Sequence, residues 1–292
     1  MDQVVELFCF TDDFCQIFLP EWEKHLLESG MKKRHRPSKL SISEIMTIII
    51  HFHQSHYRTF KHYYLFYVRQ HLKSLFPNLV SYERIVALTK SVIVPLCFLM
   101  QSLRGEETGI YFVDSTILKA CHIKREKQHK VFEGIAKKAK STIGWFFGFK
   151  LHLVINDKGE IMAFKVTQGN VDDRAPVPDL VATLVGKLVG DKGYISQALT
   201  DELIEKGLQL ITRIKKNMKN KLITLVDKIL LRKRAIIESV NDQLKNISQI
   251  EHTRHRSVWN FMANILGGLI AYAMQPKKPS IAKTVDPLLD MR

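Results

Sequence analysis

The chain lacks the features of a disulfide-stabilised or zinc-binding protein. Only four cysteines occur in 292 residues, and none lies in a C-x-x-C pair or at a zinc-type spacing from histidine. They are Cys9, Cys15, Cys97 and Cys121. We therefore expect reduced cysteines in a cytoplasmic protein.

Long hydrophobic runs are also missing. The longest apolar stretches, at 45–50 and 92–100, are well short of the roughly 20 residues that a bilayer span requires. The first ten residues carry Asp2 and Glu6 and lack the basic start and apolar block of a signal peptide. We therefore expect neither membrane insertion nor a signal peptide.

Acidic residues are scarce relative to basic ones. Lys plus Arg number 44 against 29 Asp plus Glu, which gives a net charge of +15 and a pI near 9.6. Such an excess predicts a polyanionic partner, either nucleic acid or an anionic membrane surface. With 46% hydrophobic residues, the chain can bury a full core in one large domain or two smaller ones.

The hydrophobic pattern changes near residue 105. In residues 1–105 apolar residues recur at spacings of three and four residues, which predicts an all-helical N-terminal domain. Aromatic and basic residues are interleaved within it at 56–64. Strand-like runs follow at 109–113, 146–155, 161–167, 188–189 and 208–214, with helical patterns at 177–185 and 196–205. Three meander strands followed by alternating helix and strand predict an α/β fold, a ribonuclease-H-like mixed sheet with flanking helices. We expect domains at 1–105 and 106–275 and a tail at 276–292.

Three acidic residues stand where a two-metal nuclease needs them. Asp114 and Asp191 each directly follow an apolar, strand-like run, and Glu238 lies in a helical pattern. Open α/β sheets place their chemistry at the carboxyl ends of strands. Two Mg²⁺ ions, which prefer hard oxygen ligands, can activate an attacking oxygen and stabilise a leaving one. The three carboxylates therefore predict phosphodiester chemistry.

Two basic segments flank these acids. Residues 119–140 carry a net charge of +6 and begin five residues after Asp114, and 213–234 hold nine basic residues against Asp227 alone. Either segment by itself is also typical of a solvated surface. Together, beside acids that need metal, they favour a nucleic-acid channel.

Counting about 100° per residue from Val240 gives the direction of each side chain around the helix that carries Glu238. We expect one buried stripe, made of Ile229, Ile236, Ile237, Leu244 and Ile247. Arg234, Glu238 and Lys245 then share an arc away from it, with Leu231 close by. Arg234 and Lys245 would bind the phosphates of the cleaved strand. The alternative is an i, i+4 salt bridge on an exposed face.

At this point the residues resemble a known family. Asp114, Asp191 and Glu238, the last within Arg234-x3-Glu238-x6-Lys245, look like the catalytic triad and the Y-x2-R-x3-E-x6-K signature of DDE transposases of bacterial insertion sequences. The signature's tyrosine position holds Leu231 here. The resemblance covers roughly 106–275 and implies a ribonuclease-H-like core, Mg²⁺ or Mn²⁺ as the metal, and the element's terminal inverted repeats as substrate.

We therefore expect a DNA transposase in which two metal ions, held by Asp114, Asp191 and Glu238, activate water to nick one strand, after which the freed 3′-hydroxyl attacks target DNA. Its partners are double-stranded DNA, as terminal repeats and target, and a second copy when two ends are brought together. It would be cytoplasmic, and nucleoid-associated when bound to DNA. The expected DNA-contacting residues are Arg234, Lys245, Lys124, Arg125, Lys127, Lys137, Lys138, Lys215, Lys216, Lys219, Arg232 and Lys233.

Two alternatives stay open. One is a ribonuclease-H-like nuclease or resolvase without strand transfer, and the other is a DNA-binding regulator without catalysis.

Some single residues also have two interpretations. His51, His53 and His56 form an H-x-H-x-x-H pattern in which structural histidines are favoured over a metal site, since H-x-H places two rings about 200° apart on a helix. Trp145 and Trp259 are either buried or stacked on a flipped base.

Overall fold

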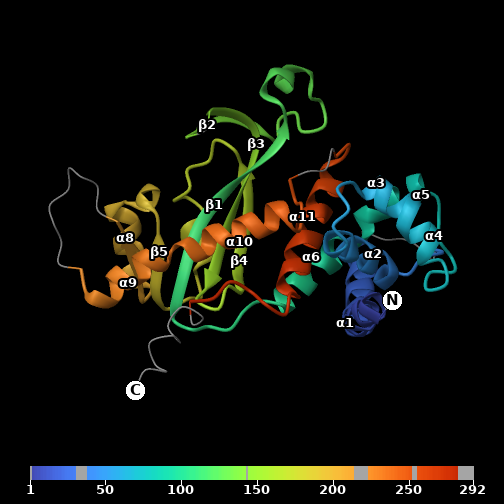
Figure 1. Cartoon of the computed structure of the whole chain (residues 1–292), viewed down its shortest axis with the longest axis horizontal. Coiled ribbons are helices and arrows are strands. Elements are labelled where there is room, and N and C mark those ends of the chain that lie inside the picture. The colour runs from blue at the N-terminus through green and yellow to red at the C-terminus, as the bar shows by residue number, and fades with distance from the viewer. Residues whose placement is uncertain (1, 31–37, 143, 214–222, 252–254, 282–292) are drawn as a thin grey trace. The chain divides into compact units, whose positions relative to one another are not determined.

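The computed structural model describes residues 2–30, 38–142, 144–213, 223–251 and 255–281. The chain divides into two compact units, and each is described by itself. The helical unit comprises Met1–Leu103 and Leu244–Met274, and the sheet unit comprises Arg104–Gln243 and Gln275–Arg292. Figure 1 shows the elements of both. The first division falls two residues from the predicted one, whereas 244–274 joins the N-terminal helices rather than the sheet.

The helical unit is built from helices alone in its described part. Its elements are α1 (Asp2–Glu28), α2 (Ile42–Gln54), α3 (Phe60–His62), the π-helical η1 (Tyr63–Val68), α4 (Arg69–His71), α5 (Tyr82–Leu88), the 3-10 turn η2 (Thr89–Val92), α6 (Ile93–Ser102) and α11 (Val258–Ala273). The helix α2 begins at a capping box, in which Ser41 accepts from the Glu44 N–H and the Glu44 carboxylate accepts from the Ser41 N–H.

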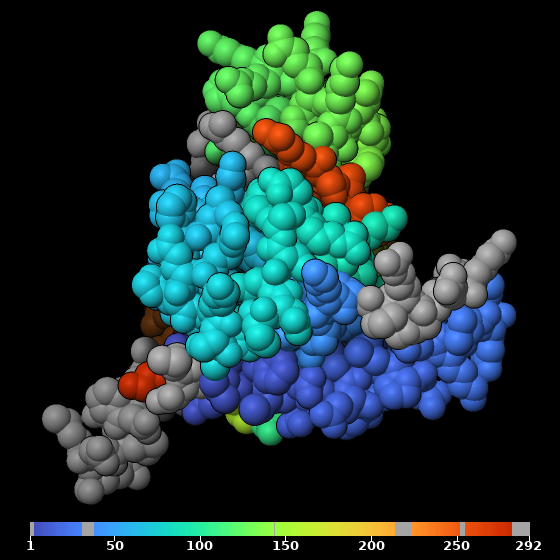
Figure 2. All heavy atoms as spheres, turned by 90° about the vertical axis from the view of Figure 1, so that its right-hand side faces the viewer, coloured from blue at the N-terminus to red at the C-terminus, as the bar shows by residue number. Residues whose placement is uncertain are grey.

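The helix α11 explains why residues 244–274 belong to the helical unit. It packs against α2 and α6, and its side chains from Asn264 to Tyr272 are buried. A Cβ added at Gly267 would lie 2.8 Å from the Ile49 side chain, so the glycine permits close packing against α2. In Figure 2 the blue atoms of α1 lie along the outside of this unit. The helix α1 packs there against α2 and α6.

One helical run in this unit is long and apolar enough, by length and composition, to cross a membrane. It spans Tyr82–Ser102 and comprises α5, η2 and α6. Glu83, Arg84 and Lys90 interrupt the apolar pattern in its first half, so the longest unbroken apolar stretch there is 92–100. Its η2 and α6 parts pack against α11 within the helical unit.

The sheet unit contains a six-stranded mixed sheet. Its strands are β1 (Ile110–Cys121), β2 (Lys137–Ser141), β3 (Gly144–Asn156), β4 (Ile161–Gln168), β5 (Gly186–Gly190) and β6 (Leu208–Thr212). The order is β2-β3-β1-β5-β6, and β4 pairs with β3 as well. Neighbours β1 and β3 are antiparallel, as are β3 and β4, whereas β1, β5 and β6 are parallel. This topology confirms the predicted ribonuclease-H-like α/β fold.

Helices cover both faces of the sheet. They are α7 (Val177–Leu180), α8 (Gln197–Glu205), α9 (Leu225–Lys233) and α10 (Ala235–Asn246). The core below α7 and α8 includes Tyr111, Val113 and Leu188. Because side chains alternate along a strand, Phe112 and Asp114 point to the opposite face. Figure 1 shows α10 crossing the sheet, and it contacts Asp114 there.

Two parts of the sheet differ from the sequence prediction. The strand β1 continues through Asp114 to Cys121 instead of ending before it, because residues beyond Asp114 pair with β3. The strand β2, of sequence Lys-Lys-Ala-Lys-Ser, was not predicted because four of its five residues are polar. Its pairing with β3 supplies the stability that its composition does not.

Candidate active site

Asp114 lies at the point where β1 leaves its parallel neighbour. The last parallel pair is Phe112 with Val189, two residues earlier. The Asp114 carboxylate accepts a hydrogen bond from Asn241 Nδ2 at 3.0 Å. Burial raises the pKa of Asp114 to about 6, and the nearby carboxylates of Asp191 and Glu238 act in the same direction. The Ser115 N–H and Arg234 oppose this rise in pKa.

Asp191 follows β5 directly. Continuing the register of β1 and β5 by two residues places it level with Asp114. Its Oδ1 accepts a hydrogen bond from the Gly193 N–H at 2.7 Å, which caps the 3-10 turn η4 (Lys192–Tyr194). A Cβ at Gly193 would stand 2.9 Å from this oxygen, so the Gly190-Asp191-Lys192-Gly193-Tyr194 motif builds a tight turn around the carboxylate.

Glu238 lies in the first turn of α10, with its side chain 55% exposed. Arg234 forms an ion pair with it one helical turn earlier. The Arg234 side chain is itself mostly buried, at 20% exposure. The i, i+4 salt bridge that was the alternative interpretation of this face is therefore present. It does not exclude a role for Glu238 at the site, because Glu238 still acts on the pKa of Asp114.

The predicted phase of this helix is partly wrong. Ile236, Ile237, Val240 and Leu244 are buried as predicted, whereas Ile229 is 44% exposed and Ile247 is 39% exposed. Leu231, placed near the exposed arc, is buried. The physical reason is a break: α9 ends at Lys233 and α10 begins at Ala235, so the phase of α10 does not extend back across Arg234.

The three carboxylates suit a hard divalent cation in donor type, because Mg²⁺ and Mn²⁺ prefer carboxylate oxygens. Asp114 also carries negative charge that burial disfavours, as its raised pKa shows. Their side chains are, however, turned toward Asn241, Gly193 and Arg234. Among the residues that the structure describes, no three His, Cys, Asp or Glu side chains converge on one point. Asp191 and Glu238 would have to rotate to share an ion with Asp114.

Two residues of the site were not singled out from the sequence. Asn241 holds Asp114 from α10, and no sequence signal distinguished it from a helix-surface asparagine. Tyr194 is buried beside the acids, and its pKa is raised by burial and then by Asp114, Asp173 and Asp191. Its position in the Gly-Asp-Lys-Gly-Tyr motif was the available signal.

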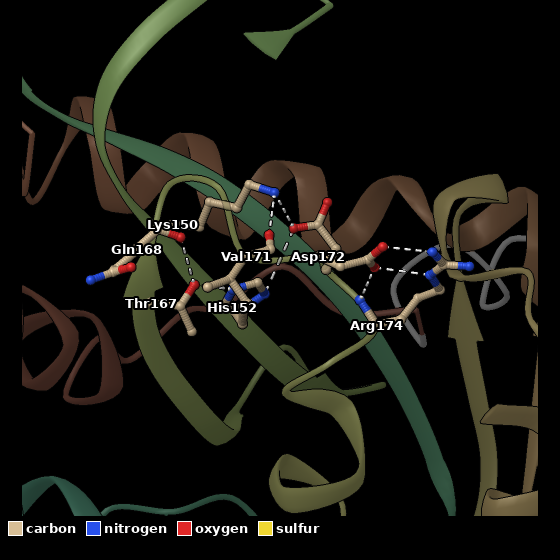
Figure 3. A network of polar contacts seen from close by, with 8 residues as sticks. Lys150, His152, Thr167, Gln168, Val171, Asp172 and Arg174 are labelled. Atoms are coloured by element: carbon tan, nitrogen blue, oxygen red, sulfur yellow. Dashed lines mark hydrogen bonds and ion pairs between the residues drawn. The ribbon is translucent and has the colours of Figure 1, made fainter. Parts of the chain in front are cut away.

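A polar network joins β3, β4 and the loop after β4 (Figure 3). Because side chains alternate along β3, its Lys150 and His152 side chains lie on the face of the sheet opposite Asp114. Lys150 Nζ donates to the Val171 carbonyl and to Asp173 Oδ1, both at 2.9 Å. His152, which pairs with Ser115 across the strands, lies 2.8 Å from Thr167 Oγ1 through Nε2. Burial lowers the pKa of His152 to about 4. The Lys150 side chain therefore joins β3 to the loop after β4.

The network also reaches the chain that follows Asp191. Arg174 forms an ion pair with Asp172 at 2.6 Å and donates to the Ile195 carbonyl at 3.4 Å. The loop after β4 is thus connected both to β3 and to Ile195, which follows the Asp191 turn in the chain. This arrangement fixes the relative positions of β1 and the Asp191 turn from the face opposite the carboxylates.

The predicted DNA-contacting residues occupy several places. Those on the segment between β1 and β3 have exposed side chains, namely Lys124, Arg125, Lys127, Lys137 and Lys138. Arg232 is exposed at the end of α9, and Lys233 is partly exposed. Lys245 forms an ion pair with Glu251 at 3.3 Å within the helical unit. Lys215, Lys216 and Lys219 lie outside the described residues.

Two histidines of the H-x-H-x-x-H pattern, His51 and His53, are buried in α2. Their Nδ1 atoms lie 2.8 Å from Tyr63 Oη and 2.5 Å from the Ser248 carbonyl, respectively. The preference for structural histidines over a metal site is consistent with these contacts. The two tryptophans with open interpretations are both half-exposed, Trp145 at 57% and Trp259 at 49%.

The sheet topology, with acids at neighbouring strands and on the helix that crosses them, defines a ribonuclease-H-like enzyme domain. A family model described as "Transposase DDE domain" matches residues 104–258, which is more than half of the chain. The chain therefore belongs to the DDE transposases, enzymes of DNA transposition and recombination. No curated protein matches the chain.

Proposed function

We propose that this transposase cuts one DNA strand at each end of an insertion element and joins the freed 3′-hydroxyl to target DNA. In this proposal Asp114, Asp191 and Glu238 hold two Mg²⁺ or Mn²⁺ ions. When bound, these ions would activate the attacking oxygen and stabilise the leaving one. The terminal inverted repeats and the target duplex are the two DNA substrates.

The single observation that carries the proposal is the placement of the acids. Asp114 on β1 is level with Asp191 at the end of the neighbouring β5, and α10, which carries Glu238, bonds Asp114 through Asn241. Asp114, Asp191 and Glu238 lie on a strand, just after a strand and on a helix, and 77 and then 47 residues separate them along the chain. Burial raises the pKa of Asp114 to about 6, and Asp191 and Glu238 nevertheless act on this pKa in the same direction. Such a cluster of partly uncompensated negative charge is typical of a site that divalent cations complete.

The protein's own residues position these acids. Asn241 holds the Asp114 carboxylate, the Gly193 N–H holds that of Asp191, and Arg234 holds that of Glu238. With Glu238 turned to a cation, the Arg234 guanidinium becomes available to a DNA phosphate, for which its planar donors are suited. In-line displacement at phosphorus serves both cleavage and joining, so one site suffices for both.

The remaining expectations belong to this proposal. Residues 1–105 recognise the element ends, the 106–275 region carries the chemistry, and the protein acts as a homodimer when two ends are synapsed. The basic stretches supply salt-dependent affinity for DNA. The protein is cytoplasmic and becomes nucleoid-associated when it binds DNA.

The test uses three isosteric variants, Asp114→Asn, Asp191→Asn and Glu238→Gln. Each is incubated with Mg²⁺ and a duplex that carries the terminal inverted repeat read from the DNA flanking the gene. We expect cleavage to fall at least about 1000-fold in each variant, with duplex binding retained. As a control, Asp201→Asn changes a carboxylate on α8 that accepts from Gln197 and should cleave like the wild type. Retained cleavage in any triad variant would remove that residue from the proposed site.

A further inference from the structure

The segment between β1 and β3 forms a basic ribbon, by which we mean residues 119–142 and 144–147. It contains the end of β1, the 3-10 helix η3 (Ile123–Gln128), β2 and the start of β3. In Figure 1 it extends beyond the rest of the sheet, away from β5. Its eight basic side chains are all exposed: Lys119, Lys124, Arg125, Lys127, Lys130, Lys137, Lys138 and Lys140. Its acidic residues are Glu126 and Glu133 alone.

The ribbon has a small core of its own. Phe132 is 2% exposed and packs edge-on against Phe149, with ring centroids 5.3 Å apart. His129 stacks on Phe132 at 5.4 Å. The strand β2 pairs with β3 over five residues from Lys137. The lysines are therefore presented by an ordered platform, on which less conformational entropy is lost on binding than in a loose basic tail.

Trp145 is the unusual residue of the ribbon. Its side chain is 57% exposed, although an indole ring ordinarily contributes its large apolar surface to a core or an interface. Lys138 Nζ lies 5.1 Å from the ring centroid, and Lys140 is the direct cross-strand partner of Trp145. Lys138 also approaches Glu126 at 3.8 Å. An exposed aromatic ring between cations is the combination that stacks on a nucleotide while the cations contact phosphates.

The strand register relates this ring to the proposed catalytic acid. Asp114 pairs with Leu153 on β3. Trp145 stands eight residues before Leu153 on the same strand, and since side chains alternate, it lies on the same face of the sheet as Asp114. The path along β3 between them is at most about 26 Å. This length corresponds to about eight base pairs of duplex DNA.

We propose that the basic ribbon is a DNA-contact surface in which the Trp145 ring packs against a nucleotide of the element end, within about eight base pairs of the cleaved phosphodiester. Lys138 and Lys140, which lie on the same face of β2 as the ring because strand side chains alternate, contact the phosphates on either side. The occupant is duplex DNA because the surface combines charge complementarity to a polyanion with an aromatic platform. The proposal rests on the proposed function, since the distance is measured from the site of cleavage.

The phosphate contacts are tested by the salt dependence of binding to a 40-base-pair duplex. The variant Lys138→Gln/Lys140→Gln should lower the slope of log affinity against log salt by about 2. The matched control, Lys158→Gln/Lys165→Gln, loses the same charge from lysines that are ion-paired with Glu106 and Asp179. It should keep the wild-type slope to within about 0.5. Equal slopes for the two double variants would overturn the phosphate contacts.

The position of Trp145 is tested by replacing it with the photo-cross-linking residue benzoylphenylalanine and mapping the cross-linked nucleotide on a terminal-repeat duplex. The expected cross-link lies within about eight base pairs of the cleavage position. Trp145→Ala should weaken binding of this duplex at least about fivefold, and Trp145→Phe should restore most of the loss. Val185→Ala is the control, since Val185 is also 57% exposed but precedes β5 at the end opposite Asp191.

The outcomes separate this inference from the proposed function. If the wild type cleaves the duplex but Trp145→Ala binds as tightly as Val185→Ala, the ribbon inference fails and the proposed function stands. A cross-link more than about fifteen base pairs from the cut likewise overturns the ribbon inference. If the wild type binds the duplex and cross-links through residue 145 but never cleaves, the proposed function fails while the DNA contact stands.

Discussion

Asn241 on α10 donates a hydrogen bond to Asp114 on β1 over 3.0 Å. This bond joins the helix that carries Glu238 to the strand that carries the first carboxylate. Asn241 is 7% exposed and Asp114 is partly buried, so water competes little for the contact. The two residues are 127 positions apart in the chain.

Replacing Asn241 should therefore lower DNA cleavage more than it lowers the stability of the fold. We expect Asn241→Ala to lower DNA cleavage about 10- to 100-fold and to raise the Mg²⁺ concentration needed for half-maximal rate, because the Asp114 carboxylate loses the donor that orients it. Single-turnover cleavage at increasing Mg²⁺ measures both effects. Ser239→Ala is the control, because Ser239 is exposed on the same helix and bonds only the Ala235 carbonyl in the described residues. A wild-type Mg²⁺ dependence in Asn241→Ala would contradict this role.

Arg234 should contribute to cleavage through its charge. It pairs with Glu238 and lowers the pKa of Asp114. We expect Arg234→Gln to lower the cleavage rate about 10- to 100-fold, since both a phosphate contact and a compensating charge are lost. Arg234→Lys should fall between Arg234→Gln and the wild type, because lysine keeps the charge and loses the planar donors. Equal rates for Arg234→Gln and Arg234→Lys would argue against an electrostatic role.

The hairpin between β3 and β4 should be sensitive to a single methyl group. Gly159 has φ +73°, and a Cβ there would lie 2.0 Å from the Pro279 carbonyl oxygen. Gly134 has a nearly equal φ of +74° with no atom within 4 Å. Gly159→Ala should thus lower the free energy of unfolding by at least about 1 kcal/mol more than Gly134→Ala, since both are strained but only the first clashes. Chemical denaturation of the two variants measures the difference, and equal losses would show that the Pro279 segment does not pack on this turn.

The helical unit should lose stability as the pH falls from about 6.5 to about 4. Burial lowers the pKa of His53 to about 4, so in this range the unfolded chain binds a proton that the folded chain does not. The free energy of unfolding should fall by about 1 kcal/mol per pH unit for this residue, with His255 adding to the trend because burial also lowers its pKa to about 4.

Denaturation curves at pH 7.5, 6, 5 and 4.5 test this expectation. His53→Gln removes one titrating ring and should reduce the slope, while His51 and His255, whose pKa burial also lowers to about 4, keep the rest. It also lowers stability at pH 7.5. His25→Gln changes an exposed histidine of α1 and should leave the dependence as in the wild type. If His53→Gln keeps the full wild-type slope below pH 6.5, the buried ring is not its source.

The sequence was sufficient for the fold class and for most of the strands, because each has a local pattern. Apolar runs ahead of Asp114 and Asp191 predicted strands, and the ladders of β1 and β5 contain those runs. The capping box of Ser41 and Glu44 at the start of α2 is a local pattern of the same kind. These features depend on neighbours in the chain, which the sequence displays directly.

The sequence was insufficient wherever distant residues decide the structure. The break at Arg234 separates α9 from α10, and no proline or glycine marks it, so Ile229 was wrongly placed on the buried stripe. The strand β2 exists because of its pairing with β3, and its own composition is that of a solvated segment. Asn241 joins the site only through a contact across the sheet unit.

The joining of DNA is the most direct test of the central claim. The wild-type protein is incubated with Mg²⁺, a terminal-repeat duplex ending in a free 3′-hydroxyl, and a supercoiled target plasmid, and the covalent products are resolved on a denaturing gel. We predict strand-transfer products in which the 3′ end of the duplex is joined to a plasmid strand, and their loss in Asp114→Asn, Asp191→Asn and Glu238→Gln. Hydrolysis of the duplex without joined products would contradict strand transfer and support a nuclease of the same fold.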